Sequence, residues 1–322
     1  MSSVEKRRLP LWACSLWGMA VMAAVLAWGA SVLAAPERAR LAAPETVARG
    51  DAFVARVASA QPAERVSFFW RGKRHVVAAR ELRNTPEDAR NTAPVWGAEI
   101  LLPAPLEEKA GRLTLGVCMG AGCPAPEATR QVRLHDRKRP VQRLTVDRKY
   151  VAPPPEEAER IRRDREKVRA ALAGHLPERL WSLPLERPVP GTVSSLFGMK
   201  RVFNGQPRGM HRGLDLRGAQ GTPIRACADG VVALVDNLYF SGNAVYINHG
   251  DGVFSSYLHM SKPLVTPGER VQRGQVVGLV GATGRVTGPH LHLGLTVQGE
   301  SVDPQPLLAP VAQDEPRGGV NK

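Results

Sequence analysis

Five residues whose types suit metal-assisted hydrolysis lie toward the C-terminal end of the chain: His211, Asp215, His259, His290 and His292. They belong to the short motifs MHRGLD, SSYLHM and GPHLHLG, which glycine-rich turns separate. Imidazoles together with one carboxylate suit Zn²⁺, and three protein ligands leave its fourth position open for water. Each motif is weak alone. Together they predict a zinc site with three protein ligands and two further histidines. Such a site can hydrolyse an amide bond.

Two histidines of this set are separated by a single residue. Because residues i and i+2 of a strand project from the same face, His290 and His292 are expected to face one cleft. If one of them binds a metal, the other stands beside it. Gly213 gives the HRGLD motif a tight path, so that its His and Asp can converge on one ion. His259 ends the alternating segment 254–259, and with His290 it is a candidate for general acid–base catalysis.

Other hydrolytic chemistries fit the sequence poorly. No G-x-S-x-G nucleophile elbow and no glycine-rich phosphate loop are present. Cys227 lies in the apolar segment 224–228, which predicts a buried small hydrophobe because apolar surroundings disfavour the thiolate. His249, in the turn sequence NHGDG, is interpreted as structural.

The elements that must position these residues are short strands. Apolar-rich segments at 231–235, 243–249, 253–260, 276–280 and 291–297, separated by glycines, predict a nearly all-β domain at 191–309. Alternation at 52–57, 65–70 and 112–117 predicts a β-sandwich of immunoglobulin-like type at 36–148. A helical and Pro-rich linker is expected at 149–190, with the helix from Glu156 to about Ala173. The predicted fold class is therefore mainly β.

The length, net charge and residue distribution of the chain limit which classes of partner it can bind. The 322 residues suggest two or three domains, and the net charge of +14 favours polyanions. The arginines are scattered and not interleaved with aromatic residues, so nucleic acid is excluded and an anionic cell envelope is favoured. Cys118 and Cys123 flank a flexible loop that either holds a metal with His135 or closes into a disulfide, and the disulfide is favoured.

The N-terminal residues predict export. Lys6, Arg7 and Arg8 precede an apolar segment at 16–33, and Val32-Leu33-Ala34 resembles a cleavage site. Residues 1–35 are therefore expected to be a signal peptide or, if retained, a membrane anchor. Residues 310–322 are expected to form a disordered tail.

The motifs in combination resemble the M23 peptidases, the lysostaphin- and LytM-like zinc metallopeptidases that cut peptide bridges in peptidoglycan. The resemblance covers about 191–308 and rests on HRGLD, SSYLHM and TGPHLH together with the intervening Gly-Thr-Pro and Gly-Ala-Thr-Gly turns. It implies a compact antiparallel β domain with a groove over the metal. It also implies one zinc per chain held by His211, Asp215 and His292, with His259 and His290 as the catalytic histidines.

The expected function is a zinc metalloendopeptidase that hydrolyses peptidoglycan cross-links during cell-wall remodelling. The alternative is a non-catalytic LytM-type regulator that activates a cell-wall amidase. Expected partners are peptidoglycan stem peptides and envelope proteins that bind the N-terminal domain. The expected location is the periplasm or cell envelope, with the inner membrane as the site of an uncleaved anchor. One further hypothesis is autoinhibition, in which the linker helix holds the sandwich across the groove. The type of cross-link and the oligomeric state stay open.

Overall fold

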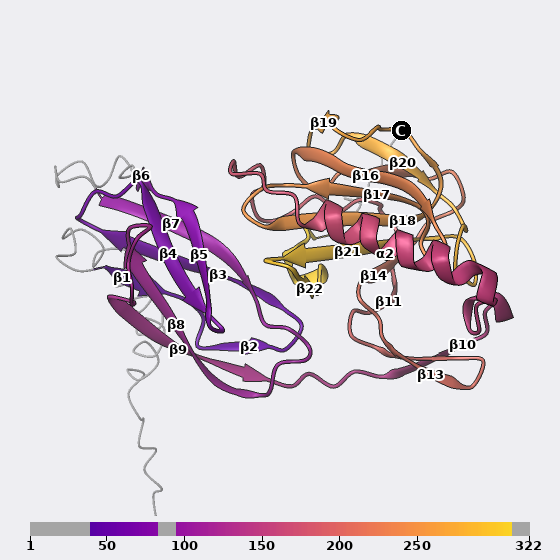
Figure 1. Cartoon of the computed structure of the whole chain (residues 1–322), viewed down its shortest axis with the longest axis horizontal. Helices are drawn as coiled ribbons and strands as arrows, with labels where there is room; N and C mark the ends of the chain where they lie inside the picture. Colours follow the sequence, from indigo (N-terminus) through magenta and orange to yellow (C-terminus); the bar gives the residue numbers. More distant parts are fainter. Residues whose placement is uncertain (1–38, 83–94, 311–322) are drawn as a thin grey trace, which may run out of the picture.

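The computed structural model describes residues 39–82 and 95–310 (Figure 1). It is mainly β, as predicted, with one long helix. The predicted leader or anchor at 1–35 and the predicted tail beyond residue 310 lie outside the described residues. Among the helices that can be placed, none combines the length and apolar character needed to cross a bilayer.

The N-terminal part is a sandwich of two sheets (Figure 1). One sheet has the order β1 (Arg40–Ala42), β3 (Ala52–Ser59), β7 (Val95–Pro103), β6 (Arg80–Leu82). The other has the order β2 (Thr46–Ala48), β9 (Ala128–His135), β8 (Gly111–Met119), β4 (Arg65–Trp70), β5 (Lys73–Ala78). This order matches the immunoglobulin arrangement of an ABED sheet against a GFC sheet. Alternate side chains such as Phe68, Trp70 and Ile100 fill the space between the sheets.

The segment between the sandwich and the C-terminal strands contains β10 (Val141–Leu144), η2 (Arg148–Tyr150), η3 (Pro155–Glu157) and α2 (Ala158–Leu172). The helix is the predicted one, and its Val168 and Leu172 pack against Leu238 and Tyr246. It contributes no residue to the pocket that holds the five predicted site residues. The apolar face of the helix packs against the sheet, and the hypothesis that the helix holds the sandwich across the groove stays a prediction.

A ten-stranded sheet dominates the C-terminal part. Its main path is β11 (Val193–Ser195), β14 (Leu214–Arg217), β21 (His290–Val297), β18 (Val253–Pro263), β17 (Gly242–Asn248), β16 (Gly230–Leu238), β19 (Arg270–Val271). Strands β15 (Pro223–Arg225), β20 (Val276–Val280) and β22 (Glu300–Val302) join it off this path, and η4 (Gln305–Leu307) follows. Every recorded pairing in this sheet is antiparallel, as predicted.

A fourth, three-stranded sheet connects the two parts. Strand β12 (Lys200–Phe203) forms a hairpin with β13 (Gln206–Met210), and β10 pairs with β12 in parallel. Leu144, Val146 and Val151 pack on Phe203 beneath this sheet. Strand β10 falls within the range 36–148 assigned from the sequence to the sandwich, although it pairs with a hairpin of the C-terminal part.

Arginines bridge the sandwich and the C-terminal part. Arg71 of the β4–β5 turn pairs with Glu300 at 3.1 Å. Arg137 pairs with Asp303 at 3.0 Å and also with Asp51. The pairs with Glu300 and Asp303 join residues more than 160 positions apart, so they fix one part of the chain against the other.

Candidate metal centre

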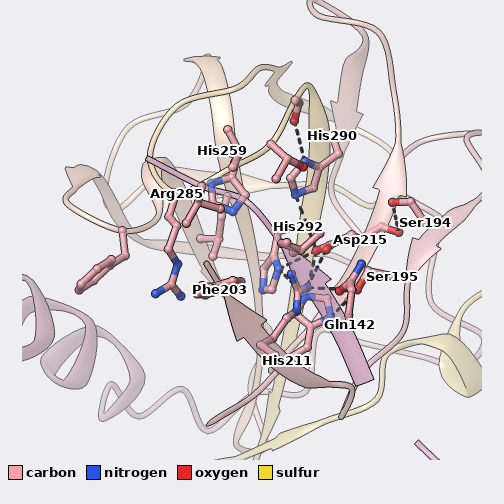
Figure 2. Close-up of a pocket in the computed structure, with 18 of the residues that line it drawn as sticks. Gln142, Ser194, Ser195, Phe203, His211, Asp215, His259, Arg285, His290 and His292 are labelled. Atoms are coloured by element: carbon pink, nitrogen blue, oxygen red, sulfur yellow. Dashed lines mark hydrogen bonds and ion pairs between the residues drawn. The ribbon is translucent and has the colours of Figure 1, made fainter. Parts of the chain in front are cut away.

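Three potential ligand atoms form a small triangle in the C-terminal part. His211 Nε2 lies 3.0 Å from His292 Nδ1, and each of these nitrogens lies 2.9 Å from Asp215 Oδ1. The sheet brings them together, because Asp215 on β14 stands opposite His292 on β21, while His211 precedes β14. Figure 2 shows the three side chains converging on one point.

The neighbours of His211 fix which nitrogen is free. Its Nδ1 lies 2.8 Å from the Leu196 carbonyl oxygen, which can only accept a hydrogen bond, so Nδ1 carries the proton. The lone pair of Nε2 then faces the triangle. A histidine whose outer nitrogen donates to a backbone carbonyl is the usual arrangement of a metal ligand.

Asp215 is held as a carboxylate. Burial acts to raise its pKa, but hydrogen bonds and charges from His211 and His292 outweigh burial and hold the pKa of this carboxyl well below 3.8. Its second oxygen, Oδ2, accepts a hydrogen bond from Arg201 at 2.9 Å. Arg201 therefore orients the carboxylate and leaves Oδ1 for the triangle.

His292 lies against backbone that only glycine permits. A Cβ on Gly213 would lie 2.4 Å from His292 Nε2 and 2.6 Å from the Leu293 carbonyl oxygen. The tight path predicted for Gly213 is therefore needed to admit the imidazole. Burial lowers the pKa of His292 despite its contact with Asp215, which favours the neutral ring that a metal requires.

The residues present fit a zinc ion. Bonds of about 2.0–2.2 Å to nitrogen and oxygen in a tetrahedron place ligand atoms about 3.3 Å apart, close to the distances of the triangle. His211, Asp215 and His292 also form a cluster recognisable as a metal site by mutual distance. A cation at the centre of the triangle would pair with the buried carboxylate and with both imidazole nitrogens, which suits a site that is so little exposed to water.

His259 reaches the same pocket through an irregularity in β18. Val245 pairs with Tyr257 and Asn243 with Met260, so β18 holds one extra residue between these pairs. Within this bulge His259 has φ of 65°, a left-handed conformation that is rare outside glycine. Bulges beside functional sites re-aim side chains, and this one turns the imidazole toward His290, with ring centroids 5.1 Å apart.

The two histidines outside the triangle have fixed tautomers. His259 Nδ1 lies 2.9 Å from the Thr283 carbonyl oxygen, and His290 Nδ1 lies 2.8 Å from the Gly288 carbonyl oxygen. Each Nδ1 therefore donates, and each Nε2 is left with a lone pair. His290 Nε2 lies 3.8 Å from Asp215 Oδ1, at the edge of the triangle. Burial, followed by the charges of His292 and His290, lowers the pKa of His259 to about 3.

A pocket of about 510 Å³ contains all five predicted residues. Strands β14, β18 and β21 supply its floor. The β12–β13 hairpin, β10 and the loop 285–289 supply its walls (Figure 2). Gln142 on β10 accepts a hydrogen bond from Ser195 Oγ at 2.9 Å, so the segment that follows the sandwich reaches the site.

Residues outside the five were missed by sequence reasoning. Arg201, Ser195 and Arg285 line the pocket, but no motif marked them.

Two other residues were expected to be structural and not catalytic, and this expectation is confirmed. His249 is buried and bonded to the Asp229 carbonyl oxygen at 2.7 Å. Cys227 is a buried free cysteine, and burial raises the pKa of its thiol to about 12. The favoured disulfide between Cys118 and Cys123 is present.

Residues 209–304 match the model of peptidase family M23. The peptidoglycan DD-endopeptidase ShyC of Vibrio cholerae is 46% identical over 123 residues, which cover 38% of this chain and 28% of that protein. The DD-carboxypeptidase/endopeptidase Mpg of Neisseria meningitidis serogroup B is 42% identical over 121 residues, again covering 38% of this chain and 28% of the relative. The matches thus span less than a third of these relatives.

A crystal structure described as a peptidase M23 of Pseudomonas aeruginosa is similar over more of the chain. It is 29% identical, with a TM-score of 0.55, and the similarity covers 80% of this chain and 92% of that one. The likeness therefore extends beyond residues 209–304.

Proposed function

We propose, from the premise that residues 209–304 are a peptidase family M23 domain, that this chain is a zinc-dependent endopeptidase that hydrolyses peptide cross-links of peptidoglycan. The observation that carries the proposal is the triangle of His211 Nε2, Asp215 Oδ1 and His292 Nδ1, with two further histidines beside it. Zinc held by these three residues would lower the pKa of a water molecule and polarise the scissile carbonyl.

His259 orients the reactants. Because its pKa is about 3, its imidazole stays neutral near pH 7, and Nδ1 is committed to the Thr283 carbonyl. Its Nε2 therefore acts as a fixed hydrogen-bond acceptor for the attacking water. A positioned acceptor of this kind removes the entropy cost of aligning the water with the peptide carbon.

His290 moves the proton. Its side chain is 18% exposed, against 8% for Asp215, so it lies at the open edge of the triangle where the peptide bond enters. Nε2 accepts the proton that the attacking water loses and then gives it to the nitrogen of the leaving amine. General acid–base catalysis by one positioned side chain is typically worth 10²–10⁴-fold in rate.

The cell envelope is the location that this activity requires, since peptidoglycan lies there. The basic charge of the whole chain, +14, would retain the enzyme near an anionic envelope. We further propose that residues 1–35 direct export, either as a cleaved signal peptide or as a retained anchor. N-terminal sequencing of the protein from fractionated cells distinguishes these two forms.

The test is digestion of purified, cross-linked peptidoglycan, with products identified by mass spectrometry and zinc measured in the same samples. The wild-type protein should carry one zinc per chain and generate new peptide ends. His290→Ala should keep its zinc and lose at least about a hundredfold in rate, because it removes only the proton carrier. His292→Ala should lose zinc and activity together, because it removes a ligand.

Two outcomes would contradict the proposal. Full cleavage by His290→Ala would remove this histidine from the reaction. A zinc-free wild-type protein that cleaves nothing but stimulates a cell-wall amidase would establish the regulator in place of the peptidase.

A further inference from the structure

The pocket around the metal centre is strongly cationic. Among the residues that the structure describes, the only carboxylate in its lining is that of Asp215. Its lining also includes five arginines: Arg201, Arg208, Arg212, Arg217 and Arg285. Asp215 is committed to the triangle of ligand atoms and to Arg201. A concave site with one sign of charge concentrates ligands of the opposite sign. The pocket is therefore built for an anionic substrate.

Two of these arginines are neutralised within the chain. Arg201 donates to Asp215 Oδ2, and Arg212 forms an ion pair with Glu107 of the sandwich. Their charges orient protein groups and are not free for a ligand. The anionic partner of the pocket must be sought at the other arginines.

Arg285 has no carboxylate partner within residues 39–82 and 95–310. Its guanidinium carbon lies 4.8 Å from the ring centroid of Phe203 and 4.9 Å from that of Phe240. Burial, together with the charges of Arg201 and Arg208, lowers its pKa. Two aromatic faces thus hold a partly desolvated cation in one position without neutralising it.

Arg208 strengthens the same side of the pocket. It donates to the Gln206 side-chain oxygen at 2.6 Å and to the Val151 carbonyl at 2.5 Å, but to no carboxylate in the described part of the chain. Arg208 and Arg285 line the same pocket, and the charge of Arg208 is one of the causes that lower the pKa of Arg285. Figure 2 shows Arg285 on the side of the pocket that His259 occupies, away from Ser194 and Ser195.

We propose that Arg285, supported by Arg208, forms a subsite that binds a free carboxylate of the cross-linked peptide while the scissile bond lies at the metal centre. A planar guanidinium held between rings is preorganised to receive a carboxylate through two parallel hydrogen bonds. This inference rests on the proposed function and narrows its substrate to stem peptides with an unamidated carboxylate near the cleaved bond.

The test compares two synthetic stem-peptide dimers of identical sequence, one with free carboxylates and one with carboxamides, through kcat/KM for cleavage by the full chain. The wild-type protein should prefer the free acid by about 10- to 100-fold, the value of a charge-assisted hydrogen-bonded pair. Arg285→Gln should lose this preference mainly through KM, and Arg208→Gln should lose part of it. Zinc content and thermal unfolding establish that each variant is folded.

Arg143 supplies a matched control. It is an exposed arginine on β10, between Gln142 and Leu144, and it does not line the pocket although both neighbours do. Arg143→Gln removes the same charge from the same region and should keep the full preference. Arg285→Lys, which keeps the charge without the planar fork, should retain only part of it.

The outcomes separate the two proposals. A wild-type protein that cleaves both dimers equally, or an Arg285→Gln variant that keeps the preference, overturns the carboxylate subsite and leaves the peptidase intact. A wild-type protein with zinc that cleaves neither dimer nor intact peptidoglycan overturns the proposed function itself.

Discussion

Two buried histidines differ in their role: one lines the pocket, and the other is part of the core. His259 and His249 are both buried histidines with lowered pKa values. His249 donates from Nδ1 to the Asp229 carbonyl oxygen and receives Ser255 Oγ at Nε2, each at 2.7 Å. Both of its nitrogens are used, so it has no capacity for chemistry. The Nε2 of His259 is free, and this difference from His249 is what makes His259 the candidate for catalysis.

The buried His249 should make stability depend on pH. Burial lowers its pKa from 6.5 to about 4, so the unfolded chain binds a proton between these values and the folded chain does not. Stability is fully present above pH 6.5 and is lost as the pH falls toward 4. Between pH 7 and pH 5 the wild-type free energy of unfolding should fall by about 2 kcal/mol through this group.

Urea unfolding at pH 7 and pH 5 measures this loss. His249→Asn, which keeps a donor toward the Asp229 carbonyl, should be less stable at pH 7 and should lack that part of the pH dependence. His175→Asn changes an exposed histidine and should follow the wild-type protein. Equal pH dependence in all three proteins would remove His249 as the cause.

At the scale of elements, strand β10 completes one wall of the pocket. It pairs with β12, and its Gln142 and Leu144 line the pocket. Phe203, which holds Arg285, rests on Leu144, Val146 and Val151. The hairpin that forms one wall is therefore supported by a segment that precedes the helix α2.

A fragment that begins at Leu185 lacks β10 and should be less active than the full chain. We expect kcat/KM on peptidoglycan to fall by at least about tenfold, because Phe203 and Arg285 lose their support and buried apolar contacts. Rates are compared at matched zinc content. A fragment that is more active than the full chain would mean instead that the N-terminal part inhibits the enzyme.

Sequence patterns predicted several strands but not their irregularities. Apolar-rich segments between glycines located β16, β17, β18, β20 and β21, and the i, i+2 spacing placed His290 and His292 on one face. Strand β14, which carries Asp215, was not predicted. The bulge at His259 was not predicted, because the extra residue shifts the phase of the alternation only over the last few residues of β18. The pairing of β10 with β12 was missed because it joins short strands about sixty residues apart, and Arg285 because scattered arginines carry no motif.

At the scale of the whole molecule, ion pairs hold the sandwich to the C-terminal part. Arg137 contacts both Asp51 and Asp303, whose side chains are only 15% and 5% exposed. Burial raises the pKa of both carboxyls, while Arg137 acts to lower it. The arginine therefore makes it tolerable to bury two carboxylates near each other.

Arg137→Met should weaken this junction in a pH-dependent way. At pH 7 it leaves two buried carboxylates without their main partner, so the free energy of unfolding should fall by about 2 kcal/mol, a value reduced for the 43% exposure of the arginine. Because the folded-state pKa of both acids is raised, protonation favours the folded state and the deficit should shrink as the pH falls toward 4.

Urea unfolding of wild type and variant at several pH values gives this difference directly. Adding Asp303→Asn to Arg137→Met should recover part of the loss at pH 7, because it removes one of the two charges. A deficit that does not change with pH, or that grows on acidification, would mean that Arg137 contributes through packing alone.

The candidate metal ligands lie far apart along the chain, and this separation affects when the site can form during protein synthesis. Asp215 and His292 are 77 positions apart, and His292 lies on β21, which pairs with both β14 and β18. A polypeptide made from its N-terminus completes the sandwich, β10 and the hairpin long before β21 exists. The candidate metal centre is thus assembled by one of the last strands to be made, so an incomplete chain lacks a complete set of ligands and would be inactive if the proposed function holds.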